Sequence, residues 1–104
     1  MKSPNNTRPS GMSFAGAINY LLATKRDDLS IRQLGLLMAC LEGRQTVRGA
    51  AEKFRVCKPA ITRAASRLAE DGLIERKPDP SDRRSVLLCI TATGRRLANN
   101  FAGR

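Results

Sequence analysis

The chain has no histidine and no tryptophan, and only three of its 104 residues are cysteines. Without histidine it lacks the commonest general base and a frequent zinc ligand. No GxxxxGK[ST] phosphate loop, GxGxxG fingerprint or GxSxG elbow occurs either. We therefore expect no enzyme activity, no catalytic residue, no cofactor and no metal.

The three cysteines are odd in number and far apart in the sequence, so they predict reduced thiols rather than disulfides. Cys40 and Cys89 lie in apolar runs and are expected in the core. Cys57 is the one candidate reactive group, because a helix start and the neighbouring Lys58 would favour its thiolate. The alternative is a small, buried turn residue.

Acidic residues are also scarce. The chain has nine Asp and Glu residues and 19 Lys and Arg residues, which gives a net charge of +10 and a pI near 10.8. Such a charge favours nucleic acid or an anionic membrane surface as the partner. No apolar run approaches the roughly 20 residues that span a bilayer, and the polar N-terminus is unlike a signal peptide. We expect a cytoplasmic, nucleoid-associated protein.

The length suits one domain, with a core of Leu, Ile, Val and Ala because aromatic residues are few. Residues 1–11 are polar and predict a disordered basic arm, followed by a single domain over residues 12–104. From Ser13, apolar residues recur at helical spacing, which predicts a first helix ending before Asp27. This stripe comprises Phe14, Ala17, Ile18, Leu21 and Leu22.

Three more helices are predicted by their caps and apolar spacing. Ser30 to Gln33 has the form of a capping box, and the stripe Leu34, Leu37, Met38 and Leu41 follows it up to Gly43. Thr46 can cap a short third helix with the stripe Val47, Ala50, Ala51 and Phe54. After a break at 55–58, Pro59 suits the first turn of a fourth helix whose inward stripe is Ile61, Ala64, Ala65 and Leu68. The last two form a helix-turn-helix.

The outward face of the fourth helix combines small, hydroxyl and Arg side chains, which suit contact with bases in a DNA major groove. The alternative is an ordinary solvated face. We expect Thr62, Arg63, Ser66, Arg67 and Glu70 to point outward, with Lys58 and Ala60 at the exposed start of the helix.

A basic hairpin follows this helix. Strand-like residues 73–77 and 85–90 flank the turn formers and strand breakers of 78–82, so pairing should stop near Lys77 and resume near Ser85. The resulting loop would carry Arg83 and Arg84. Asp82 lies two residues before Arg84, a spacing at which its carboxylate can hold the guanidinium extended towards a narrow minor groove. An incidental surface ion pair is the alternative.

In this order and spacing, the segments 61–63, 73–76, 79–84, 90–91 and Gly94 resemble the winged-helix core of the multiple-antibiotic-resistance-regulator (MarR) family of bacterial transcription factors. The resemblance covers roughly residues 29–97. It implies a mainly α fold with a small β-hairpin, an Arg84 that enters the minor groove while Asp82 holds it, and a recognition helix over about 58–71. Together with the phosphate contacts expected from the basic hairpin, the candidate DNA-binding residues are Lys58, Pro59, Ala60, Thr62, Arg63, Ser66, Arg67, Arg76, Lys77, Asp82, Arg83 and Arg84.

The chain departs from this family after the hairpin, where only residues 91–103 stand in place of its long C-terminal helices. Those helices build the family's dimer interface and help to form its effector pocket, so a small-molecule effector is not expected. We expect a homodimer through residues 13–25 and the C-terminal helix, since two-fold pairing is the commonest assembly. Alternatively, the protein binds DNA as a weaker unit that needs a partner, and the first stripe packs against the second helix of its own chain.

These features predict a sequence-specific regulator of transcription, a repressor that binds an inverted repeat in double-stranded DNA. A sequence-tolerant architectural DNA binder would share the charge, and a winged-helix adaptor acting on a transcription complex would share the fold. A membrane-surface binder is disfavoured, because the basic segments lack aromatic anchors.

Overall fold

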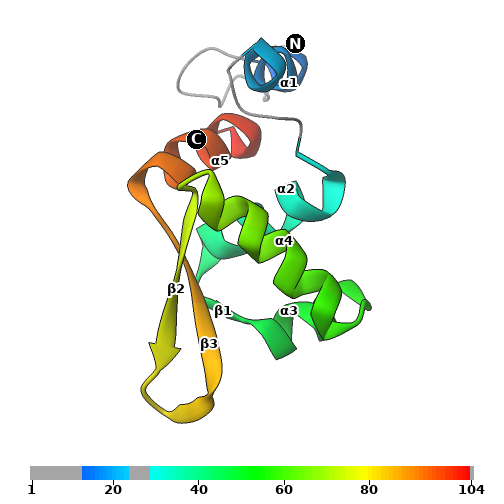
Figure 1. Cartoon of the computed structure of the whole chain (residues 1–104). Coiled ribbons are helices and arrows are strands. Elements are labelled where there is room, and N and C mark those ends of the chain that lie inside the picture. Colours follow the sequence, from blue (N-terminus) through cyan, green and yellow to red (C-terminus); the bar gives the residue numbers. More distant parts are fainter. Residues whose placement is uncertain (1–12, 24–28, 104) are drawn as a thin grey trace.

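The computed structural model describes residues 13–23 and 29–103. In chain order the elements are α1 (Phe14–Ala23), α2 (Ile31–Glu42), β1 (Gln45–Thr46), α3 (Val47–Phe54), α4 (Lys58–Glu70), β2 (Ile74–Asp79), β3 (Asp82–Ile90) and α5 (Ala92–Ala102). Figure 1 shows α4 in the middle, α1 and α5 at one end, and the β2–β3 hairpin reaching to the other. The mainly α fold with a small hairpin is confirmed. The expected arm over 1–11 and the first helix's end before Asp27 lie outside the described residues.

The predicted helix starts of α2 and α3 are confirmed by their hydrogen bonds. Ser30 Oγ accepts the Gln33 N–H at 3.0 Å, while Gln33 Oε1 accepts the Ser30 N–H at 2.9 Å, which completes the capping box. Thr46 Oγ1 accepts the Gly49 N–H at 2.9 Å. The helix-turn-helix break is made by Arg55, which takes a left-handed conformation at φ 58°.

The core lies where α2, α4 and the base of the hairpin meet. All four residues of the predicted α4 stripe are buried, at Ile61, Ala64, Ala65 and Leu68. The α2 stripe was misplaced in part: Leu36 and Cys40 are among its most buried residues, whereas Leu34 and Met38 are half-buried. The helix contacts both α4 and α5, so its buried arc is wider than one stripe.

Of the cysteines, Cys40 is buried and Cys89 half-buried. Burial is the main reason that the pKa of the Cys40 thiol rises to about 11, with a smaller contribution from Cys89. Cys57 is exposed, which contradicts the interpretation of a buried turn residue. None of the helices within 13–23 and 29–103 is long and apolar enough to cross a membrane.

The sheet has three strands in the antiparallel order β1-β3-β2, so the short strand β1 joins the predicted hairpin. Two residues carry too little pattern to be recognised as a strand in the sequence. The prediction that pairing stops at Lys77 was wrong, because β2 continues and Pro78 lies opposite Val86. Proline is tolerated there since β2 is an edge strand. The connecting turn therefore shrinks to residues 80–81.

A close approach joins the end of α4 to the start of α5. The Thr91 hydroxyl donates to the Gly72 carbonyl at 2.7 Å and accepts the Gly94 N–H at 3.0 Å, while the Thr91 N–H donates to the Leu73 carbonyl at 3.0 Å. A Cβ atom on Gly94 would collide with the Leu73 carbonyl. Glycine is therefore required at this position by space.

We expect Gly94→Ala to lower the free energy of unfolding by roughly 1–3 kcal/mol, because α5 or the Leu73 turn must move to admit the methyl group. Thermal unfolding followed by circular dichroism would measure this as a fall in Tm of about 4–8 °C for each kcal/mol. Gly43→Ala is the matched control, since a Cβ there meets nothing within 4 Å. Equal Tm values for the two variants would contradict the close approach.

Helix α1 packs over α5. The rings of Phe14 and Phe101 meet edge to face, with centroids 6.0 Å apart and planes at 76°. Ala17 is fully buried, but Phe14 and Leu22 stay 57% and 56% exposed. The helix contains no charged residue. Within residues 13–23 and 29–103, large apolar side chains of α1 are therefore left exposed.

Candidate nucleic-acid interface

The start of α4 presents polar side chains to solvent. Cys57 is the N-cap, Lys58 opens the helix and Pro59 lies in its first turn, as predicted, and all three are exposed. Ala60 was predicted to be exposed and is only 6% exposed. The reason is helical spacing: Ala60 precedes the buried Ala64 by four residues and so shares its inward face.

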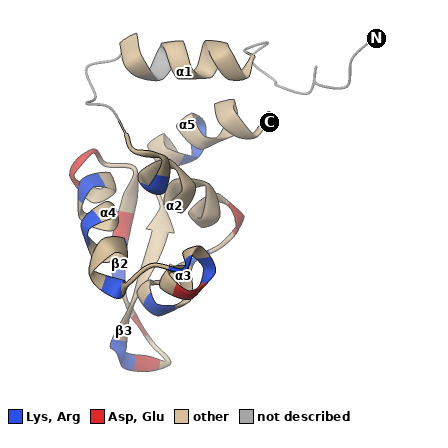
Figure 2. Cartoon of the chain, turned by 90° about the vertical axis from the view of Figure 1, so that its right-hand side faces the viewer, with Lys and Arg blue, Asp and Glu red and all other residues tan. Residues whose placement is uncertain are grey.

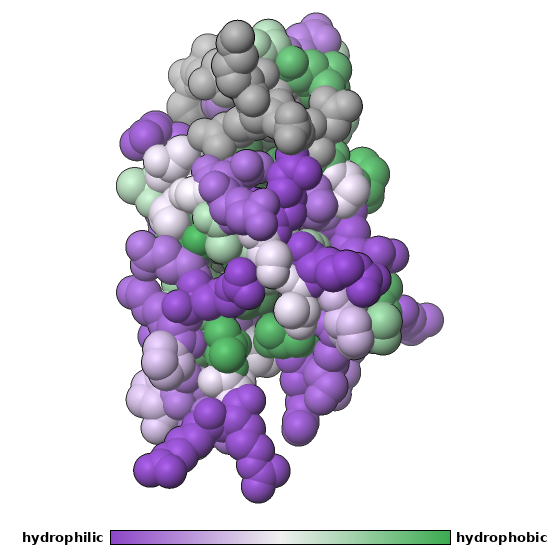
Figure 3. Space-filling model, in the orientation of Figure 1, coloured by the Kyte–Doolittle hydropathy of each residue, from purple (hydrophilic) through white to green (hydrophobic). Residues whose placement is uncertain are grey.

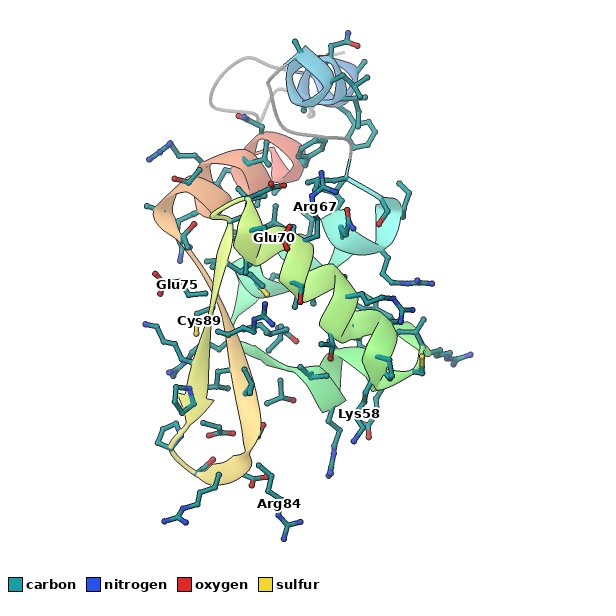
Figure 4. All side chains as sticks on the ribbon, in the orientation of Figure 1. Lys58, Arg67, Glu70, Glu75, Arg84 and Cys89 are labelled. Atoms are coloured by element: carbon teal, nitrogen blue, oxygen red, sulfur yellow. The ribbon has the colours of Figure 1, made fainter. Side chains whose placement is uncertain are left out.

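Further along α4, the outward residues divide into two groups. Thr62 and Arg63 are exposed as predicted, whereas Ser66 and Arg67 are half-buried. Arg67 Nε donates to Asp71 Oδ2 at 3.3 Å, and the two side chains are only 25% and 19% exposed. Figure 4 shows Arg67 far along α4 from Lys58. Arg67 is thus engaged within the protein, contrary to the expected outward orientation.

The wing, defined as β2, β3 and their turn, has an irregular tip. Pro78 lies opposite Val86, but the next residue, Asp79, lies opposite Asp82, so residues 83–85 of β3 have no counterpart on β2. Such a bulge turns side chains away from the regular alternation of a strand. Arg83 and Arg84 are both exposed, and Figure 4 shows Arg84 extending beyond the turn.

Two carboxylates organise this tip through the main chain. Asp79 Oδ1 accepts hydrogen bonds from the Ser81 backbone N–H at 2.9 Å and from the Ser81 hydroxyl at 2.8 Å. These bonds lower the pKa of the Asp79 carboxyl, and the backbone bond has the larger effect. Asp82 Oδ1 accepts the backbone N–H of Arg84 at 3.0 Å. Asp82 therefore bonds the main chain of Arg84 and not its guanidinium, which was the predicted partner. Such a bond from an Asp side chain to a backbone N–H two residues later is typical of Asx turns. Asp82 therefore holds the strand that carries Arg84.

The neighbours Arg76 and Lys77 point to opposite faces of β2, because side chains alternate along a strand. Arg76 shares the face of the buried Ile74 and donates to Ser66 Oγ on α4, from Nη1 at 3.3 Å and Nη2 at 3.2 Å. Lys77 lies on the other face, where Nζ is 3.7 Å from Glu75 Oε1 in an exposed ion pair. The structure thus separates two residues that the sequence had placed together.

A groove of about 700 Å³ runs between the wing and the beginnings of α3 and α4. Three cations line it, one from each element: Arg48 from α3, Lys58 from α4 and Arg84 from the wing. Thr46 and Thr62 contribute hydroxyl groups, and Asp79 and Asp82 lie at the wing end. The sequence interpretation missed Arg48 and Thr46. Arg48 could have been noticed in the sequence, because it lies two residues after the helix cap Thr46. The partial positive charge of a helix start disfavours a cation there unless an anion binds nearby.

The charges are unevenly spread over the molecule. Figure 2 shows Lys and Arg along α3 and α4 and at the wing tip, whereas α1 has none. Figure 3 shows hydrophilic side chains over the wing end and apolar surface on α1 at the opposite end. The polar groove and the apolar face of α1 therefore lie at opposite ends of the molecule.

A helix-turn-helix whose second helix is followed by a basic antiparallel hairpin defines a winged helix-turn-helix protein. The chain belongs to the MarR family, whose model matches residues 27–85.

Curated relatives and solved structures agree with this assignment. An uncharacterised HTH-type transcriptional regulator from Mycobacterium leprae is 36% identical over 70 residues, which cover 66% of this chain and 49% of that protein. An HTH-type transcriptional regulator from Mycobacterium tuberculosis matches to the same extent. The chain thus spans about half the length of these relatives.

Among solved structures, a mutant of ZitR from Lactococcus lactis is 27% identical, covers 86% of this chain and 68% of its own, and has a TM-score of 0.67. The transcriptional regulator BldR from Sulfolobus solfataricus is 30% identical, with coverage of 82% and 60% and a TM-score of 0.67. These similarities confirm the predicted winged-helix fold.

Proposed function

We propose that this protein is a sequence-specific, double-stranded-DNA-binding regulator of transcription that acts as a repressor. The observation that carries the proposal is the groove in which cations from α3, α4 and the wing converge. DNA backbone phosphates are the ligand such a groove suits, because they present closely spaced negative charge. The relatives named as transcriptional regulators support the same function.

In the proposed complex, the exposed start of α4 enters the major groove and the wing tip enters the adjacent minor groove. Lys58, Thr62 and Arg63 would face the bases and their flanking phosphates. Arg84 would enter the minor groove, held there by the main-chain bond to Asp82. Pro59 would let the DNA backbone approach the helix closely, and Arg83 would contact a phosphate. Lys77, which is ion-paired with Glu75, would add to the positive field of the wing. Buried Ala60 and the ion-paired Arg67 would support the helix rather than touch DNA.

The apolar side of α1 supports a homodimer. Phe14 and Leu22 are large and more than half exposed, and α1 lies directly over α5. A second copy packed on α1 and α5 would cover these side chains by two-fold symmetry. Because each copy carries one wing and one recognition helix, the dimer would bind an inverted repeat.

The relatives are named as regulators and not as enzymes, and we propose that this chain likewise has no catalytic activity. A DNA ligand would place it in the bacterial cytoplasm, on the nucleoid. The proposal needs no small-molecule effector.

Mapping of protected sites on genomic DNA, with sedimentation at micromolar concentration, tests the proposal. A dimeric repressor should protect inverted repeats whose half-sites lie about one helical turn apart, and should prefer them over random duplex by about a thousandfold or more. Equal affinity for both DNAs would favour an architectural binder, and no affinity for either would favour a protein adaptor. A monomer that protects single half-sites would contradict the homodimer.

A further inference from the structure

Arg76 of the wing is bonded to the recognition helix itself. Two nitrogens of its guanidinium, Nη1 and Nη2, donate to the single oxygen Ser66 Oγ at 3.3 and 3.2 Å. These bonds span ten residues of sequence and connect β2 to the middle of α4. Since a hydroxyl oxygen has two lone pairs, the acceptor capacity of Ser66 is used by this contact.

The position of Arg76 follows from the register of the sheet. Arg76 lies opposite Leu88 of β3, which is fully buried, and two residues after Ile74, which is buried as well. This face of the wing is therefore the one that turns towards α4. Arg76 is the first residue on that face beyond the core, at the point where the wing begins to extend away from the helix.

We propose that Arg76 and Ser66 form a positioning pair, which fixes the wing relative to the recognition helix and does not itself provide the main contacts to DNA. The inference rests on the proposed DNA binding. Beyond Arg76, the wing reaches outward as two strands and a turn, and its tip residues are exposed. The bond between Arg76 and Ser66 at the base of the wing limits how far the wing tip can move relative to α4.

The effect on binding follows from preorganisation. Lys58 and Arg63 on α4 and Arg84 on the wing must reach two adjacent grooves in the same complex. If the wing is free to move in the unbound protein, that freedom is lost when DNA binds, which weakens binding without the loss of any contact. A single net hydrogen bond corresponds to about a three- to tenfold change in affinity.

The first arm of the test uses the free protein, so it is independent of DNA. Hydrogen exchange is measured for the backbone amides of residues 86–88, which lie opposite β2, in the wild type, Ser66→Ala, Arg76→Ala and the double variant. We expect both single variants to exchange faster by a similar factor, and the double variant to exchange no faster than the singles. Unchanged exchange in Ser66→Ala and Arg76→Ala would overturn the pair, whether or not the protein binds DNA.

The second arm measures affinity for a protected genomic site at several salt concentrations with the same variants. We expect Ser66→Ala and Arg76→Ala each to weaken binding about three- to tenfold, and the double variant to be no weaker than the weaker single. The slope of log K against log salt should stay at the wild-type value in Arg76→Ala. Lys77→Ala is the matched control, because it removes a neighbouring cation from the opposite face and should be additive with Ser66→Ala.

A phosphate contact by Arg76 would give a different pattern. The slope in Arg76→Ala would then shrink by about 0.9 for each protomer, and the losses from Ser66→Ala and Arg76→Ala would add. That result would overturn the positioning role while leaving DNA binding intact. Wild-type protein that binds no DNA would instead contradict the proposed function, and the exchange data would still decide whether the pair holds the wing.

Discussion

Raising the salt concentration from 50 to 200 mM is expected to weaken DNA binding by about 250- to 1,000-fold for each protomer engaged. Five exposed cations flank the groove and the start of α4: Arg48, Lys58, Arg63, Arg83 and Arg84. If each neutralises one phosphate, the slope of log K against log salt is about −4 to −5, and roughly double that for a dimer. Fluorescence anisotropy with a labelled duplex would measure it.

The control for this titration is Arg95→Ala, which removes an exposed cation from α5, far from the groove. Its slope should equal that of the wild type, whereas Arg48→Ala should reduce the slope by about 0.9 per protomer. Arg48 is an informative choice, because only the folded structure places it in the groove. A wild-type slope near zero would exclude DNA as the main ligand.

The loss of Arg63 or of Arg84 is expected to weaken binding in different ways. If Arg63 bonds a guanine bidentately, Arg63→Ala should weaken binding to the cognate site by about 1–3 kcal/mol and relax the preference at one base pair, with little effect on random DNA. Arg84→Ala should be most harmful where the flanking minor groove is narrow, so its effect should shrink when A·T-rich flanks are replaced by G·C pairs. Competition binding with matched duplexes measures both.

Two further variants sharpen this comparison. Arg67→Ala is the control for Arg63→Ala, because Arg67 is bonded to Asp71 and its loss should leave base preference unchanged. Asp82→Ala should weaken binding although it makes the protein more positive, because the Arg84 main chain loses its acceptor. Tighter binding by Asp82→Ala would remove the physical support for a held wing.

Helix starts and the inward face of α4 could be predicted from the sequence because their causes are local. Ser30 and Thr46 bond to amides three residues away, and spacing alone assigns Ile61 and Leu68 to one face. The basic helix followed by a basic hairpin also predicted the family. These features need no knowledge of which elements become neighbours.

The remaining features depend on partners distant in sequence. Strand β1 exists only because β3 offers it a paired edge, and Pro78 is accepted in β2 because β2 lies at the edge of the sheet. Likewise, the outward face of α4 looked uniform until the fold placed Arg76 beside Ser66. Local pattern identifies what kind of side chain is present, and tertiary neighbours decide what it contacts.

The bulged tip of the wing is held together by its own hydrogen bonds and does not pack into the core. Residues 80–85 contribute nothing to the buried core, and Asp79 and Asp82 hold the tip by bonds that begin and end within it. Substitutions at Arg83 or Ser85 are therefore expected to change the proposed minor-groove contacts at almost no cost in stability. Over evolutionary time, such a tip can diversify and acquire new DNA preferences while the scaffold beneath it remains constant.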